Sequence, residues 1–329
     1  MNPLTRRIRH AAALCLLALG LAGPSAMAQV ANYPNKPIRL VLGYAPGGVA
    51  DITARLVAQK LSESMGQPVV VDNKPSAGGI VAGEMVAKAD PDGYTLLHMN
   101  YGNAVSAALF KQMPYDIKRD FQPVSAMGFF DVVMLVDKGS DIRSVQDFIA
   151  KAKANPDKYN IGSVSLGSGQ HMAATLFKSL SEVPATLVPY KTTPSLMLAL
   201  KSKDIEVAFE IVSPSLALLR SGELRALAMS STTRFRGLPD VPTLAETGVK
   251  GYDVTAWNGI AAPARTPRAI VERLNREINA VLALPEVRAK FQEVGIDARG
   301  GSPEDLRDTL AAEIDKWNRL VALMKIERL

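Results

Sequence analysis

Cysteine is almost absent from this 329-residue chain, which contains one, Cys15, and histidine is rare, with three residues. Only His98 and His171 lie beyond the first thirty residues, and no HExxH motif or similar spacing joins them. These absences exclude a disulfide framework and a cysteine-ligated zinc site, and they give little support to a histidine-ligated metal. We therefore expect neither a metal nor a cofactor.

Motifs for the common enzymatic chemistries are missing as well. The chain has no GxxxxGK phosphate loop, no GxGxxG at a strand–helix turn and no GxSxG around Ser165 or Ser168. It has no basic run with interleaved aromatic residues, so we expect no nucleic-acid partner. One catalytic alternative stays open, a secreted hydrolase that uses Ser168 and His171, but their close spacing at a helix start suits a triad poorly.

The first 28 residues have the pattern of a secretory signal peptide. Three arginines at positions 6, 7 and 9 precede the apolar run Ala11–Leu21, and Ala26–Ala28 fits a small-residue cleavage site. Cleavage after Ala28 removes three arginines and no acidic residue, so the formal charge falls from +6 to +3. No later apolar run reaches the roughly 18 residues of a membrane helix. We expect a secreted, soluble protein that is not an enzyme.

Three strand-to-helix turns of one kind stand out, at Gly43–Asp51, Ser76–Gly79 and Ser163–Gly169. The start of a helix has unpaired N–H groups and the positive end of the helix dipole, and glycine lets a ligand approach the main chain. The turns are therefore candidates for binding an anion from two sides. The alternative is that each is only a tight connection, with Asp51 as the N-cap of its helix.

The order of elements predicts an α/β fold with two domains. Strands at Ile38–Tyr44, Val69–Val71 and Tyr94–Met99 alternate with helices, which is typical of a parallel sheet, and we predict that Val69–Val71 is buried because its apolar run is continuous. A β-rich stretch at Phe121–Val136, broken at Gly128 and Asp131, crosses into a second domain that repeats the alternation.

Two amphipathic helices close the chain. Their predicted core faces are Ile270, Leu274, Ile278 and Val281 in one, and Leu306, Leu310, Ile314, Trp317 and Val321 in the other. The predicted division is a signal peptide of residues 1–28, a first domain of residues 29–126 and 230–329, and a second domain of residues 127–229. Each domain is expected to be a mainly parallel sheet flanked by helices, with the ligand in the cleft between them.

The candidate ligand contacts come from the three turns and the strand ends beside them. In the first domain they are Tyr44, Ala45, Gly47, Gly48, Asp51, Ala77, Gly78 and Gly79; in the second they are Ser163, Ser165, Ser168, Gly169, His171, Lys191 and Glu210. An alternative stays open for Asp51, as the N-cap of its helix, and for five others. The alternatives for these five are a capping or packing role for Ser168 and His171, a wall-filling role for Tyr44, a solvated Lys191, and an exposed or salt-bridged Glu210.

Several short stretches match a known family in order along nearly the whole chain. They are Ala45–Gly48 with Asp51 and Arg55, Ala77–Gly79, Pro91–Leu97, Pro189–Lys191, Leu238–Thr243, and Trp257 with Gly259. On these motifs the chain resembles the Bug-type substrate-binding proteins of tripartite tricarboxylate transporters. The resemblance implies a periplasmic binding protein of the type II-like, Venus-flytrap kind. Such a protein closes on a small organic carboxylate and delivers it to the large and small membrane subunits of a transporter.

The resemblance also implies different roles for the two domains in ligand binding. It implies that the two first-domain turns hold one carboxylate, partly through ordered waters, and that the second-domain turn sets the identity of the ligand. The chain departs from the family pattern at Thr192, Glu210, Asn258 and the segment Leu166–Gln170. The ligand therefore stays open among dicarboxylates, amino acids and aromatic acids. We expect a monomer, and a receptor that signals to a sensor protein is the alternative to transport.

Overall fold

The computed structural model describes residues 32–329 except residues 157, 165–167, 324–325 and 329. The predicted signal peptide and Ser165 lie outside the described residues. Within the described part of the chain, none of the helices combines the length and the apolar character that a membrane crossing requires.

Strands and helices alternate through most of the chain. The strands are β1 (Ile38–Leu42), β2 (Val69–Asn73), β3 (Thr95–Asn100), β4 (Phe121–Asp137), β5 (Asn160–Val164), β6 (Thr186–Tyr190), β7 (Val207–Ile211), β8 (Leu224–Met229), β9 (Thr255–Pro263) and β10 (Ile296–Ala298). The helices are α3 (Val49–Met65), the short η1 (Ala77–Gly79), α4 (Ile80–Ala87), α5 (Tyr101–Leu109), α6 (Val145–Ala154), α7 (Gly169–Ser181), α8 (Thr193–Ser202), α9 (Val212–Arg220), α10 (Arg268–Ala283), α11 (Pro285–Glu293) and α12 (Pro303–Leu323).

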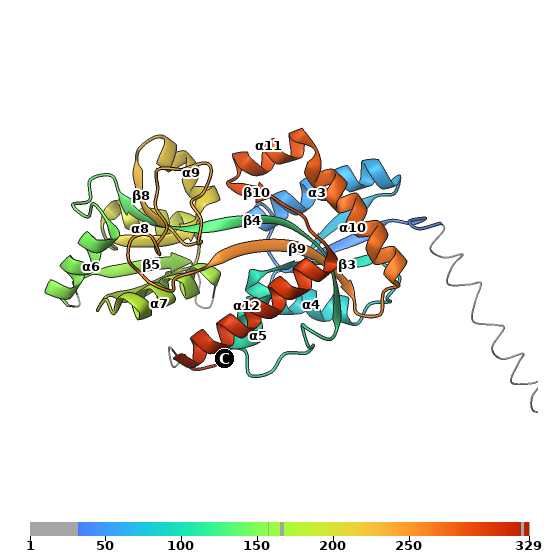
Figure 1. Cartoon of the computed structure of the whole chain (residues 1–329), viewed down its shortest axis with the longest axis horizontal. Helices are drawn as coiled ribbons and strands as arrows, with labels where there is room; N and C mark the ends of the chain where they lie inside the picture. Colours follow the sequence, from blue (N-terminus) through green and yellow to red (C-terminus); the bar gives the residue numbers. More distant parts are fainter. Residues whose placement is uncertain (1–31, 157, 165–167, 324–325, 329) are drawn as a thin grey trace, which may run out of the picture.

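Two lobes lie side by side in Figure 1, joined by the long strands β4 and β9. The chain between β8 and β9 lies against the second lobe, where the Tyr252 hydroxyl donates to the Ala173 oxygen. The first lobe holds β1–β3, β9, β10, α3–α5, α10–α12 and β4 up to Asp131; the second holds the rest of β4 through β8. One mixed sheet runs through both, in the order β2-β1-β3-β9-β4-β7-β5-β6. The predicted α/β fold is confirmed, whereas the domain bounds stay a prediction.

Each lobe contains a set of three parallel strands. Strands β1, β2 and β3 are parallel to one another, and β5, β6 and β7 form a second parallel set. Strand β9 lies between β3 and β4 and is antiparallel to both. The carboxyl ends of each parallel set, and the turns that follow them, are therefore gathered at one edge of the sheet, where ligands of open α/β folds bind.

The predicted break in the crossing stretch is wrong, because β4 is one strand of 17 residues. It pairs with β9 as far as Asp131 and with β7 from Val132 onward. Gly128 does not end the strand: it pairs with Ala298 of β10, and a side chain on it would come within 2.6 Å of Ile296. The glycine serves close packing in this strand rather than a turn.

The prediction that Val69–Val71 is buried is also wrong. Strand β2 is the edge strand of the first lobe, and Val70 in its centre is 53% exposed. Three consecutive valines suit the pleated backbone of any strand, including an edge strand. An apolar run therefore predicted the strand correctly, but not its place in the sheet.

The two C-terminal helices were predicted correctly. All nine predicted core residues of α10 and α12 are buried, with Trp317 at 0% exposure. Helix α12 packs against α5 and β4, and α10 packs against α3 and β4. These helices hold the first lobe together around β4. Helices α5 and α11 and strand β10 have no counterpart among the predicted elements.

A buried carboxyl lies at the crossing itself. Asp131 pairs with Thr255 of β9 and is 7% exposed. Burial raises the pKa of Asp131 to about 6; a hydrogen bond from Ser231 opposes this shift, and the nearby charge of Asp253 adds to it. At neutral pH the crossing thus holds a carboxylate that is less stable there than in the unfolded chain.

We expect Asp131→Asn to increase the free energy of unfolding at about pH 7.5 by on the order of 2–3 kcal/mol. The native pKa of about 6 exceeds the unfolded value, so between about pH 6 and 4 the native state binds the proton more tightly. Wild-type stability from this group therefore rises as the pH falls through that window, and the variant lacks the rise. Urea denaturation of both proteins at several pH values measures it. A difference that does not change with pH would contradict this prediction.

Candidate functional site

The first turn leaves the start of a helix uncapped. Helix α3 begins at Val49 after Gly48, which takes an extended conformation and supplies no side-chain cap. The N–H groups of Val49, Ala50 and Asp51 have no acceptor among the described residues. Residues 45–48 are exposed, and a side chain built on Gly48 would meet nothing closer than the Ala45 oxygen at 4.0 Å. The turn therefore presents free donors at the positive end of a helix.

Asp51 is not the N-cap of α3, but it accepts hydrogen bonds that stabilise this turn. Its Oδ2 accepts the N–H of Gly47 and Nε of Arg55, both at 2.9 Å, and its Oδ1 accepts Nδ2 of Asn73 at 2.9 Å. Burial alone would raise the pKa of Asp51, but the hydrogen bonds from Arg55, Gly47 and Asn73 outweigh it and hold the pKa below its usual value. Its charge is balanced by Arg55, so it does not repel an anion at the turn.

We expect Asp51→Ala to lower the free energy of unfolding at neutral pH by about 2–3 kcal/mol, because Asn73 and the Gly47 N–H lose a buried acceptor while Arg55 stays half in water. A carboxyl with a lowered native pKa stabilises above its unfolded pKa, so the difference from wild type shrinks as the pH falls below about 4. Urea denaturation measures it. Asp308→Ala, at an exposed ion pair with Arg307, is the control; equal losses in both variants would contradict the prediction.

The second turn lies directly against the first. A side chain on Gly43 would come within 2.5 Å of the Gly79 Cα, and the Ser76 N–H donates to the Gly43 oxygen at 3.4 Å. Gly78 and Gly79 both have positive φ, 63° and 68°, which glycine adopts without strain. Ala77 begins η1 just before them. The two first-lobe turns predicted from sequence therefore form one backbone surface at the ends of β1 and β2.

A third strand end completes this surface and was missed in the sequence. Asn100 ends β3 and caps α5, accepting the Gly102 N–H at 2.8 Å, while Asn103 reaches back to the Asn100 N–H. The Tyr44 hydroxyl donates to Asn100 Oδ1 at 3.0 Å, which fixes the ring beside the first turn. An Asn-x-x-Asn pair directly after an apolar strand was the available signal, because it resembles a capping box.

In the second lobe, the predicted turn residues have structural roles. Ser163 belongs to β5 rather than to the turn, is fully buried, and its Oγ lies 3.0 Å from His171 Nδ1. Ser168 caps α7: its Oγ accepts the His171 N–H at 3.1 Å and donates to the Val164 oxygen. Burial lowers the pKa of His171, which favours a neutral ring. A ligand contact by these residues stays a prediction.

Glu210 is neither exposed nor salt-bridged, contrary to the alternative considered for it. It is 1% exposed at the end of β7 and forms no ion pair with any described residue. Its carboxyl accepts Nε2 of Gln170 at 2.9 Å, Oγ1 of Thr193 at 2.7 Å and the Ile211 N–H at 2.8 Å. Burial raises its pKa, and these three hydrogen bonds oppose the rise. Lys191, by contrast, is exposed and contacts none of these groups.

The two lobes touch where these strand ends meet. Gly169 starts α7, and a side chain on it would come within 1.9–2.2 Å of the Tyr101 ring of the first lobe. The Tyr101 hydroxyl lies 3.5 Å from Gln170 Oε1. Tyr101 itself is buried, with its ring edge-on to Phe130. Four residues outside the predicted contacts also lie at these strand ends: Asn73, Asn100, Tyr101 and Thr193. Gln170 joins them from the segment Leu166–Gln170, where the chain departs from the family pattern.

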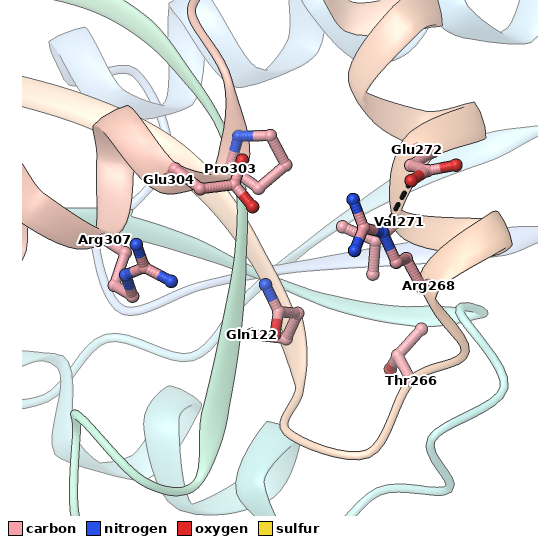
Figure 2. Close-up of a pocket in the computed structure, with 8 residues that line it drawn as sticks. All are labelled: Gln122, Thr266, Arg268, Val271, Glu272, Pro303, Glu304 and Arg307. Atoms are coloured by element: carbon pink, nitrogen blue, oxygen red, sulfur yellow. Dashed lines mark hydrogen bonds and ion pairs between the residues drawn. The ribbon is translucent and has the colours of Figure 1, made fainter.

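A separate pocket of about 230 Å³ lies elsewhere on the first lobe (Figure 2), at the starts of α10 and α12. Arg268 and Arg307 line it together with Glu272 and Glu304, and Arg268 is paired with Glu272 at 2.7 Å. Its charges balance, and none of the predicted ligand contacts belongs to it. The described residues also contain no group of three or more metal-ligating side chains.

The comparison with known proteins decides the family. The model of the "Tripartite tricarboxylate transporter family receptor" matches residues 53–326. The chain belongs to this family. BugT of Bordetella pertussis is 33% identical over 305 residues, which cover 92% of this chain and 94% of BugT. The resemblance to Bug-type proteins, inferred from short motifs, is confirmed.

Solved structures of similar proteins confirm the fold of this family receptor. The R. palustris protein Rpa4515, solved with adipate, has a TM-score of 0.81 and 34% identity, covering 90% of this chain and all of that one. MatC of Rhodopseudomonas palustris, solved with malate, has a TM-score of 0.76 and 29% identity, covering 88% of this chain and all of that one. The fold is that of periplasmic binding proteins, and the family is one of solute-binding proteins.

Proposed function

We propose that this protein captures a small organic carboxylate between its two lobes in the periplasm and delivers it to the large and small membrane subunits of a tripartite transporter. The uncapped start of α3 carries the proposal, because its free N–H groups adjoin an exposed glycine turn and face no competing side-chain cap. A charge-assisted hydrogen bond contributes about 1.5–3 kcal/mol. Three or four such hydrogen bonds, less the free-energy cost of ordering and closure, correspond to micromolar binding, a binding free energy of about −8 kcal/mol.

The environments of Ser163 and Ser168 give little support to the hydrolase alternative. Ser163 contacts the His171 ring but is fully buried, and the Ser168 hydroxyl is bonded to the Val164 oxygen. A triad requires a serine that is both activated and accessible to substrate. We therefore propose a binding protein without catalytic activity. We propose in addition that it has no cofactor and acts as a monomer.

A ligand screen tests the proposal. Protein is unfolded and refolded to remove any co-purified ligand, and its melting temperature is measured with di-, tri-, amino and aromatic carboxylates, adipate and malate among them. We expect at least one acid to raise the melting temperature by several degrees, because a ligand that binds only the native state stabilises it. If no carboxylate stabilises the protein, the proposed function is wrong. Loss of uptake of the identified acid in a deletion strain then separates transport from signalling.

A further inference from the structure

Two helix starts of the second lobe, those of α7 and α8, differ from that of α3, whereas α9 also begins without a side-chain cap. Ser168 caps α7 through the His171 N–H, and Thr192 caps α8 through the Ser195 N–H at 3.3 Å. Helix α3 has no side-chain cap. A capped helix start has one orphan donor fewer for a ligand. The starts of α7 and α8 therefore offer a carboxylate fewer free N–H groups than the start of α3, which supports placing the ligand's carboxylate on the first lobe.

Beside the start of α7, the second lobe directs one amide oxygen, that of Gln170, toward the first lobe. Gln170 Nε2 donates to Glu210 Oε1 at 2.9 Å. A carboxylate only accepts hydrogen bonds, so it fixes the amide with its NH₂ group toward Glu210. The amide oxygen of Gln170 then points the other way, where it lies 3.5 Å from the hydroxyl of Tyr101 on the first lobe.

Gln170 is the member of this group that a ligand can reach. It is half-buried, whereas Glu210 behind it is 1% exposed and is held in place by Thr193 and the Ile211 N–H. Among the described residues no cation pairs with Glu210. The second lobe thus offers an amide oxygen backed by an acidic group. Hydrogen-bond acceptors in such a place reject a second carboxylate and favour a group that donates.

We propose that Gln170 is a specificity-determining residue that selects ligands with a carboxylate at one end and an N–H or O–H donor at the other, and that Glu210 is the positioning residue that sets its amide. The inference rests on the proposed function. It excludes dicarboxylates as the preferred class, because their second carboxylate would face the Gln170 oxygen. It favours amino- and hydroxy-carboxylates.

Three acids of equal length test the inference: 6-aminohexanoate, adipate and hexanoate. Calorimetry with protein expressed from the full chain is expected to show that 6-aminohexanoate binds about tenfold or more tightly than adipate. Gln170→Lys places a cation at the same point and is expected to reverse this order. The amide introduced by Glu210→Gln can both donate and accept a hydrogen bond, so the Gln170 amide is free to turn. We expect this variant to reduce the preference for 6-aminohexanoate over adipate at least threefold.

Gln146→Lys, on an exposed position of α6, is the matched control and is expected to leave the order unchanged. Tighter binding of adipate than of 6-aminohexanoate by the wild type would overturn the inference alone, as would an unchanged order in Gln170→Lys. Binding of none of the three acids, together with a negative ligand screen, would overturn the proposed function and the inference with it.

Discussion

Gly48→Val is expected to weaken carboxylate binding by at least about 100-fold while the protein still folds. Gly48 has φ −81° and ψ 172°, a conformation that any residue adopts, and the space beside it is open. A valine there fits the backbone but places its branched side chain over the free N–H groups of α3. Three charge-assisted hydrogen bonds lost together account for a change of this size, about 3 kcal/mol or more.

The folded state of Gly48→Val changes little. Valine is a poorer N-cap than glycine, which costs at most about 1 kcal/mol. Gly47 is the less useful position, because its φ of 85° would strain any other residue and confuse lost binding with lost stability. Calorimetric titration with an acid identified in the screen measures the effect, and Ala217→Val on an exposed face of α9 is the control. Wild-type affinity in Gly48→Val would show that the first turn does not bind the anion.

Gly169→Ala is expected to hold the two lobes apart. The added methyl group would overlap the Tyr101 ring, which is buried against Phe130 and is not free to swing away. Alanine favours a helix over glycine by about 1 kcal/mol, so the second lobe itself loses no stability. A ligand that contacts both lobes then loses its contacts with one lobe, and we expect the affinity for the ligand to fall by about tenfold or more.

Small-angle scattering and calorimetry together measure the effect of Gly169→Ala. The variant should be more extended than the wild type in the presence of ligand, and the double variant Gly169→Ala/Tyr101→Ala, which removes the obstructing ring, should recover the compact form. Gly139→Ala, in an exposed loop, is the control. If Gly169→Ala binds ligand and compacts as the wild type does, the contact between Gly169 and Tyr101 is not part of the bound state.

The sequence predicted those parts of the site that depend on local chemistry. The glycine turns of the first lobe and the helix after each follow from the conformational freedom of glycine, which acts over a few residues. The cap at Ser168 was only one of two roles left open for that residue. The fold class and the buried faces of α10 and α12 follow from periodicity in the same way.

The parts that the sequence did not predict depend on distant neighbours. Glu210 is buried because Gln170 and Thr193, from two other strand ends, converge on it, and nothing near it in the chain indicates this. Val70 is exposed, as is its β1 partner Arg39, because this part of the sheet face has no element of the described chain packed over it. Tyr101 acquires its role only when the second lobe brings Gly169 against it.

The position of β9 sets the order in which the lobes are completed during synthesis. Strand β9 begins at Thr255, yet it lies between β3 and β4, so residues 95–100 have no partner on that side until three-quarters of the chain has emerged. The strands of the second lobe all lie in one continuous segment, from Val132 to Met229, and are therefore present earlier. Pairings between distant segments form late. The first lobe is therefore the last to complete its sheet, and the α3 turn takes up its binding geometry only near the end of folding.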